Sequence, residues 1–211
     1  MKIEIFTGGP FETNSYLLIE DKNCLLIDPT FNSYEFFISK IKNYDLEPLA
    51  IILTHSHIDH IADVAKLKSH FKLKVYIHKL DQKNLINPGS DGLPFYEHIE
   101  GCFPDELVYD GQEIKIQKFT FKVIHTPGHS FGSCCFYFKQ EGYLFSGDTL
   151  FQGSYGNISF PTSEPEKIKN SLHVLSLLPK DTIVLPGHGA STTIEKEKWL
   201  FDLNKIFYDR N

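Results

Sequence analysis

Histidine and aspartate residues gather in the segment Thr54-His55-Ser56-His57-Ile58-Asp59-His60, which offers three imidazoles and one carboxylate. Imidazole nitrogens and carboxylate oxygens suit zinc, iron and manganese. His129, Asp148 and His188 lie further along the chain, each next to a glycine that permits a sharp turn. Together these residues supply five imidazoles and two carboxylates. They predict a site for two divalent metal ions.

Each group of candidate ligands follows a segment that we expect to be a strand. These strands cover residues 49–53, 119–125, 142–146 and 182–186. In folds that combine helices with parallel strands, ligand sites form beyond the carboxyl ends of the strands. The candidate ligands therefore meet at one sheet edge, where two ions would lie roughly 3.5 Å apart.

Seven nitrogen and oxygen ligands leave coordination positions for water, which separates this site from a structural zinc site closed by four ligands. A water between two cations loses a proton near neutral pH, and the resulting metal-bridging hydroxide would attack a carbonyl carbon. We predict Asp59 and Asp148 as catalytic residues, with Asp59 orienting the nucleophile. Asp28 is either a hydrogen-bond partner of a metal ligand or a turn residue before Pro29.

The elements that must position these residues form two strand-rich halves. Strands of the first half are predicted over residues 2–6, 14–20, 23–28, 49–53 and 74–77. Strands of the second half are predicted over residues 113–116, 119–125, 134–139, 142–146 and 182–186. Residues 86–105 contain several glycines and prolines and predict a long loop.

Helices are predicted between and after these strands. Apolar spacing indicates helices over residues 34–43 and from about Asp59 to Phe71. The capping boxes Ser163-Glu164-Pro165-Glu166 and Thr192-Thr193-Ile194-Glu195 predict a helix to about Leu178 and a C-terminal helix. The order of elements indicates two packed sheets with helices outside, in a single domain over residues 1–211.

The composition is that of an ordinary globular protein with 41% hydrophobic residues and a net charge of −6. The acidic balance argues against nucleic acid as a partner and leaves a small-molecule substrate. The apolar runs are too short to span a bilayer, and we expect no signal peptide, because the first residues lack the apolar run that one needs. The four cysteines lack metal-binding or disulfide-framework spacing, so we expect them reduced and the chain cytoplasmic. The oligomeric state stays open.

The motif His55-x-His57-x-Asp59-His60, completed by His129, Asp148 and His188, resembles the full ligand set of the metallo-β-lactamase superfamily. The resemblance extends over nearly the whole chain. It implies an α/β fold, a four-layer αββα sandwich of two mixed β-sheets flanked by helices, with the metals at one edge.

The resemblance also implies a role for each candidate ligand. The first ion would be held by His55, His57 and His129. The second would be held by Asp59, His60 and His188, with Asp148 bridging both. Zinc is the expected metal, with iron or manganese as alternatives.

Within the superfamily, the sequence is similar to small glyoxalase II-like proteins, the hydroxyacylglutathione hydrolases. The segments Thr126-Pro127-Gly128-His129-Ser130 and Pro186-Gly187-His188-Gly189 carry this likeness. It implies metal-dependent hydrolysis of a thioester, whose thiolate departs more readily than an amide nitrogen. True β-lactamases lack an aspartate at the position of Asp148, so we expect them to be less similar.

Two departures from the glyoxalase II pattern concern the substrate. We expect the extra C-terminal helical domain of full-length glyoxalase II to be missing, because little more than one predicted helix follows His188, and Asn157 stands where small relatives often carry an arginine. Arginine binds carboxylates through a planar fork, and glutathione has two carboxylates. Tyr155, Asn157 and Phe160, together with the aromatic pair Phe95-Tyr96, are candidates for a more apolar substrate pocket.

Two other functions share the motif. A mononuclear-iron sulfur (persulfide) dioxygenase would use His55, His129 and either His57 or Asp148. A phosphodiesterase of the ribonuclease Z type shares the same His-x-His-x-Asp-His pattern, but the acidic balance counts against it.

Overall fold

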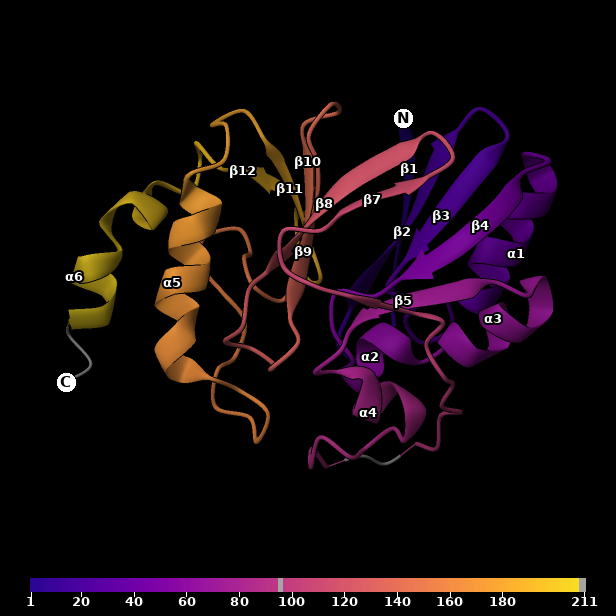
Figure 1. Cartoon of the computed structure of the whole chain (residues 1–211), viewed down its shortest axis with the longest axis horizontal. Helices are drawn as coiled ribbons and strands as arrows, with labels where there is room; N and C mark the ends of the chain where they lie inside the picture. Colours follow the sequence, from indigo (N-terminus) through magenta and orange to yellow (C-terminus); the bar gives the residue numbers. More distant parts are fainter. Residues whose placement is uncertain (95–96, 209–211) are drawn as a thin grey trace.

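The computed structural model describes residues 1–94 and 97–208 as two β-sheets packed face to face, with helices on both outer sides (Figure 1). The six strands of the first sheet, in spatial order, are β1 (Lys2–Gly8), β2 (Thr13–Glu20), β3 (Asn23–Ile27), β4 (Glu47–Ile52), β5 (Lys74–His78) and β6 (Glu106–Val108). Strands β1 to β3 pair antiparallel, whereas β3 to β6 run parallel. The loops that follow the parallel strands therefore lie at the same edge of this sheet.

The second sheet is also mixed. Its six strands, in spatial order, are β12 (Thr192–Thr193), β11 (Ile183–Pro186), β10 (Tyr143–Gly147), β9 (Cys134–Phe138), β8 (Phe119–His125) and β7 (Glu113–Ile116). Only β10 and β11 pair parallel among these strands. Their loops thus leave the sheet at the same end.

Helices cover both outer faces of the two sheets. They are α1 (Tyr34–Asn43), α2 (Ile58–Ile61), α3 (Val64–Phe71), α4 (Gln82–Ile86), α5 (Pro165–Ser176), the 3-10 helix η1 (Lys198–Asp202) and α6 (Leu203–Tyr208). Figure 1 shows α1 and α3 outside the first sheet and α5 and α6 outside the second. The implied four-layer αββα sandwich is confirmed.

Successive side chains of β3 point to opposite faces of the sheet and pack into two different apolar cores. Leu25 and Ile27 pack into the cluster between the sheets, whereas Leu26 packs toward α1 and α3. A strand covered on both faces has no polar face, which explains the unbroken apolar run in the sequence. Phe145 of the second sheet lies fully buried in the same central cluster.

The helix predicted from about Asp59 to Phe71 is wrong in its continuity, because it divides into α2 and α3. Asp63 lies at the break, and its backbone N–H bonds Pro29 O at 3.1 Å instead of continuing the helix. Its carboxylate accepts a hydrogen bond from the backbone N–H of Tyr34 at 3.0 Å. These long-range bonds stop the first helix after one turn.

The helix start predicted from the C-terminal capping box is also wrong. Thr192 and Thr193 form β12, and helical structure begins only at Lys198. Thr192 Oγ1 donates to the buried carboxylate of Glu197 at 2.5 Å, so the hydroxyl is used outside a helix cap. The helix predicted after the first capping box does form as α5, but the hydroxyl of Ser163 donates to His129 O instead of capping it.

The sequence patterns did not predict the short elements α4 and β6, which lie at the two ends of the predicted 86–105 loop. Within the described part of that loop, no further helix or strand interrupts it. No described helix has both the length and the apolar character needed to cross a membrane.

Candidate metal centre

The structure brings all seven predicted ligands together where the loops after β4, β8, β10 and β11 meet. Six of them are buried, and His188 is partly exposed at the rim. Three overlapping groups have ligand atoms within 4.8 Å of one another. The groups are His55, His57 and His129; His55, His60 and Asp148; and Asp59, His60 and His188.

Asp148 lies between the two halves of the cluster. Its Oδ1 is 3.3 Å from His60 Nε2, and its Oδ2 is 3.3 Å from both His129 Nε2 and His188 Nε2. One carboxylate therefore faces ligands of both proposed ions. This position fits the bridging role that we propose for it.

Several inward-facing atoms have no hydrogen-bond partner, and this observation tests the fit of a metal. His55 Nε2, His60 Nε2 and Asp148 Oδ1 are buried without such a bond. An unsatisfied polar atom is costly when buried. Divalent ions bound among these atoms would satisfy all three, so the cluster has the composition and geometry of a divalent metal site.

Backbone carbonyls fix the orientation of two histidine rings. His129 Nδ1 bonds Asn157 O at 2.7 Å, and His188 Nδ1 bonds Phe11 O at 2.9 Å. A carbonyl can only accept, so each Nδ1 must carry the proton. In the neutral form of each ring, Nε2 then carries the lone pair that faces the cluster, as metal binding requires.

His60 is oriented by Asp28, as one of the two interpretations of that residue anticipated. Its Nδ1 is 3.0 Å from Asp28 Oδ2. The same carboxylate accepts hydrogen bonds from Thr54 Oγ1 at 2.6 Å and Thr54 N at 2.8 Å. Asp28 thus joins the end of β3 to the start of the ligand segment. Gly147 makes room for this contact, because a Cβ there would lie 2.5 Å from Thr54 Oγ1.

Asp59 is held by Thr13, which no pattern in the sequence indicated as a site residue. Thr13 Oγ1 donates to Asp59 Oδ2 at 2.6 Å across 46 positions of the chain. Asp59 Oδ2 also lies 3.3 Å from His188 Nε2. The contact fixes a carboxylate that we propose as both metal ligand and orienting group.

Burial and neighbouring charges divide four of the cluster's histidines in the metal-free protein into two kinds. Burial lowers the pKa of His57 to about 3 and holds that of His55 well below its usual value. Burial acts in the same direction on His60 and His188, but the nearby carboxylates prevail. They raise the pKa of His60 well above its usual value and that of His188 to about 10. His55 and His57 are thus ready to bind metal, whereas the other two must first lose a proton.

A cavity of about 300 Å³ opens onto the cluster. Asn157 and Phe160 line it, and so do Leu93 and Pro94 from the predicted long loop. Tyr155, predicted beside them, is not among the described lining residues. It packs instead against Trp199 and Phe207, with ring centroids 6.2 and 5.7 Å away. The predicted contributors Phe95 and Tyr96 lie outside the described residues.

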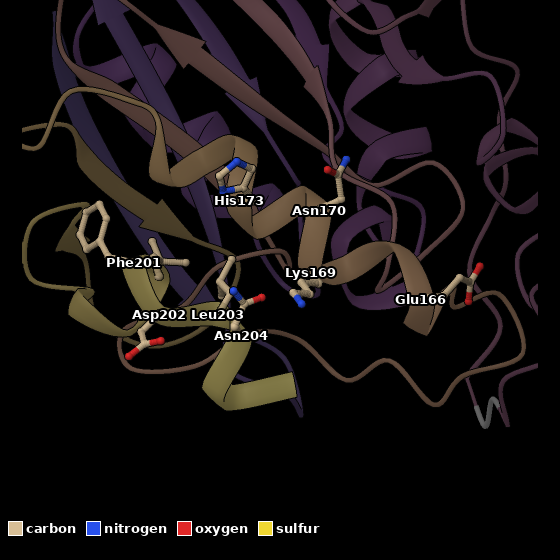
Figure 2. A pocket seen from close by; sticks show the side chains of 9 residues that line it. Glu166, Lys169, Asn170, His173, Phe201, Asp202, Leu203 and Asn204 are labelled. Atoms are coloured by element: carbon tan, nitrogen blue, oxygen red, sulfur yellow. The ribbon is translucent and has the colours of Figure 1, made fainter. Parts of the chain in front are cut away.

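A second hollow lies between α5 and the C-terminal helices, apart from the histidine cluster (Figure 2). Figure 2 shows Lys169 and His173 on α5 and Asp202 and Asn204 on the facing segment. None of the seven predicted ligands is among its described lining residues. It therefore has no part in the site.

Comparison with known proteins agrees with this geometry. The sequence model of the metallo-beta-lactamase superfamily matches residues 8–188. The probable metallo-hydrolase YqgX of Bacillus subtilis is 35% identical, over 94% of this chain and 95% of that protein. The hydroxyacylglutathione hydrolase GloC of Haemophilus influenzae is 34% identical, over 94% of this chain and 95% of that protein. The chain belongs to the metallo-β-lactamase superfamily.

Two solved structures show the same similarity. The BLEG-1 B3 metallo-beta-lactamase is 38% identical, with a TM-score of 0.87 over 93% of this chain and 96% of the other. TTHA1623 in a di-iron-bound form is 35% identical, with a TM-score of 0.79 over 92% and 96%. BLEG-1 does not fit the expectation that β-lactamases would be less similar, whereas the metallo-beta-lactamase IND-7, at 21% identity, fits it.

Proposed function

We propose that the chain is a metal-dependent hydrolase of thioesters, similar to hydroxyacylglutathione hydrolases. The observation that carries this proposal is the position of Asp148 between two groups of inward-facing histidines. Support also comes from the likeness to GloC over nearly the full length of both chains. The proposed active site takes small molecules, because its cavity is only about 300 Å³ in volume.

The proposed ligands of the first ion are His55, His57 and His129. Those of the second are Asp59, His60 and His188, and Asp148 is proposed to bridge them. Two bound ions supply the acidity that turns water into a nucleophile and the positive charge that polarises a carbonyl group. We propose zinc for both positions. Iron is the first alternative, since the relative TTHA1623 has been solved in a di-iron-bound form.

The roles of the protein side chains follow from their contacts. Asp59, held by Thr13 Oγ1, has its carboxylate fixed in the cavity wall, where it can orient a nucleophilic water and accept its proton. Asn157 offers an amide that can bind the substrate. Among the described lining residues, every titratable group belongs to the proposed ligand set. No separate acid is thus at hand for the leaving group, which favours a thiolate over an amine.

The proposal is tested by assaying the metal-loaded protein and its Asp148→Ala variant side by side. The substrates are thioesters, a lactone, a phosphodiester and a β-lactam. We expect the intact protein to hold two ions and hydrolyse thioesters, and the variant to lose metal and activity together. Asp63→Asn is the control, because Asp63 is also buried but bonds Tyr34 and Lys66 instead of a proposed metal ligand.

Three other results would replace the proposal. Turnover of the phosphodiester alone would indicate a nuclease-type activity, and turnover of the β-lactam alone a lactamase. Oxygen consumption with a persulfide and one iron per chain would indicate a sulfur dioxygenase. An Asp148→Ala variant with full metal content and activity would refute the assigned site.

A further inference from the structure

The walls of the cavity above the metal cluster are apolar and come from four separate parts of the chain. Phe11 lies between β1 and β2, Ile58 begins α2, Leu93 and Pro94 follow α4, and Phe160 follows β10. Phe11 keeps 59% of its surface exposed. Such an aromatic side chain at a cavity mouth offers apolar surface that a ligand can cover.

The polar lining residues carry no fixed positive charge apart from the cluster itself. Apart from the proposed metal ligands, Asn157 is the one polar residue among the described lining residues, and no lysine or arginine occurs among them. A carboxylate held against these walls would lose water without gaining an ion pair, which is costly. An apolar group would instead gain by leaving water.

We propose, building on the thioester hydrolase activity above, that the site selects thioesters whose groups next to the scissile carbonyl are apolar and uncharged. Glutathione carboxylates then contribute little to binding. The apolar wall, rather than an anion-binding side chain, sets the preference among substrates.

The test compares matched pairs that differ only in the thiol part. Each acyl group, from acetyl to phenylacetyl, is offered on glutathione and on N-acetylcysteamine, which has no carboxylate. We expect kcat/KM to rise with acyl size and to differ less than about tenfold between the two thiols. A glutathione preference well above tenfold that weakens with salt would overturn the inference but leave the thioester hydrolase intact.

Binding measurements keep the inference testable if no thioester is hydrolysed. Non-hydrolysable thioether ketones of the same two thiols are titrated into the protein, and their Kd values are compared. Leu93→Lys adds a cation to the wall, and Leu93→Met is the neutral control. We expect only Leu93→Lys to tighten binding of the glutathione compound, by about threefold or more. Two results together would contradict the inference: tight binding of the glutathione compound by the unchanged protein, and no tighter binding by Leu93→Lys.

A second inference rests on a different observation, the buried carboxylate of Asp81 beyond the end of β5. It is 5% exposed and accepts hydrogen bonds from Ser56 N at 2.9 Å, Ser130 Oγ at 3.0 Å and Gly132 N at 2.7 Å. A Cβ on Gly132 would lie 2.5 Å from Asp81 Oδ1, so only glycine permits this approach.

The two loops that meet on Asp81 carry the proposed ligands of the first ion. Ser56 stands between His55 and His57, and Ser130 follows His129 directly. We infer that Asp81 is a positioning residue for this group of three histidines. Its oxygens receive only donors, so an amide at this position would turn N–H groups toward other N–H groups.

Cobalt substitution tests this role, because cobalt reports ligand geometry through its visible absorption. In Asp81→Asn we expect one of two cobalt ions to bind about 10- to 100-fold more weakly, with an altered spectrum for that ion. Asp63→Asn should bind both ions as the unchanged protein does. A destabilised Asp81→Asn protein that keeps both cobalt affinities and spectra would show that Asp81 acts on folding alone.

Discussion

Replacement of Asp28 by asparagine tests how the protein orients a metal ligand. Asp28 Oδ2 bonds His60 Nδ1 at 3.0 Å and Thr54 Oγ1 at 2.6 Å, and Oδ1 accepts Thr54 N at 2.8 Å. If the amide oxygen of asparagine keeps the bond to Thr54 N, its NH2 group must face His60 Nδ1. The imidazole then accepts there and carries its proton on Nε2, which faces the cluster.

The size of the effect follows from the lost bond. A hydrogen bond to a charged group contributes about 1.5–3 kcal/mol, which corresponds to about 10- to 100-fold in affinity. We expect Asp28→Asn to lower the affinity for the ion at His60 by that factor. The affinity for the ion at His55 and His57 should fall far less. Competition with a coloured chelator measures both affinities.

The control for this experiment is Asp63→Asn, which removes a buried carboxylate that bonds Tyr34 and Lys66 instead of a histidine. Equal losses at both ions in Asp28→Asn, or equal losses in the two variants, would indicate general destabilisation. Unchanged affinities in Asp28→Asn would refute the reasoning, because the orientation of His60 would then not depend on Asp28.

Three further predictions concern other parts of the structure. Gly187→Ala should release metal, since the added Cβ would lie 2.2 Å from Asp148 Oδ1, and elemental analysis against the unchanged protein measures the loss. Phe145→Ala should lower the free energy of unfolding by about 3–5 kcal/mol because its ring is fully buried, and a urea titration showing under 1 kcal/mol would contradict this. The pKa of His188 is raised from 6.5 to about 10 in the metal-free protein, so its ion pairs stabilise the fold fully below pH 6.5 and are lost as the pH rises toward 10. The stability difference from His188→Gln, measured with chelator present, should therefore shrink over this range, and a constant difference would contradict the prediction.

The seven candidate ligands could be found from the sequence because each lies in the loop or short helix that comes after a predicted strand. Glycines mark the turns at His129, Asp148 and His188, and the carboxyl ends of neighbouring parallel strands lie close together. Local patterns of this kind fix both the strand and the residue beyond it. The sandwich followed from the same strands and helices.

The residues that hydrogen-bond the ligand segments and hold them in place could not be found in this way. Thr13 meets Asp59 across 46 positions, and Asp81 meets Ser130 across 49. Nothing near these residues in the sequence indicates their partners, because the contacts exist only after the two sheets pack. The capping boxes were unreliable because other acceptors compete for the hydroxyls. Ser163 donates to His129 O across 34 positions, and Thr192 donates to Glu197 five positions on.

A metal titration with a thioester assay tests the central claim most directly. Metal-free protein receives zinc or iron in steps, and hydrolysis, bound metal and oxygen consumption are followed together. The account predicts thioester hydrolysis that reaches its maximum at two ions per chain, without oxygen consumption. Maximal turnover at one iron with oxygen consumed, or two bound ions without hydrolysis of any thioester, would contradict it.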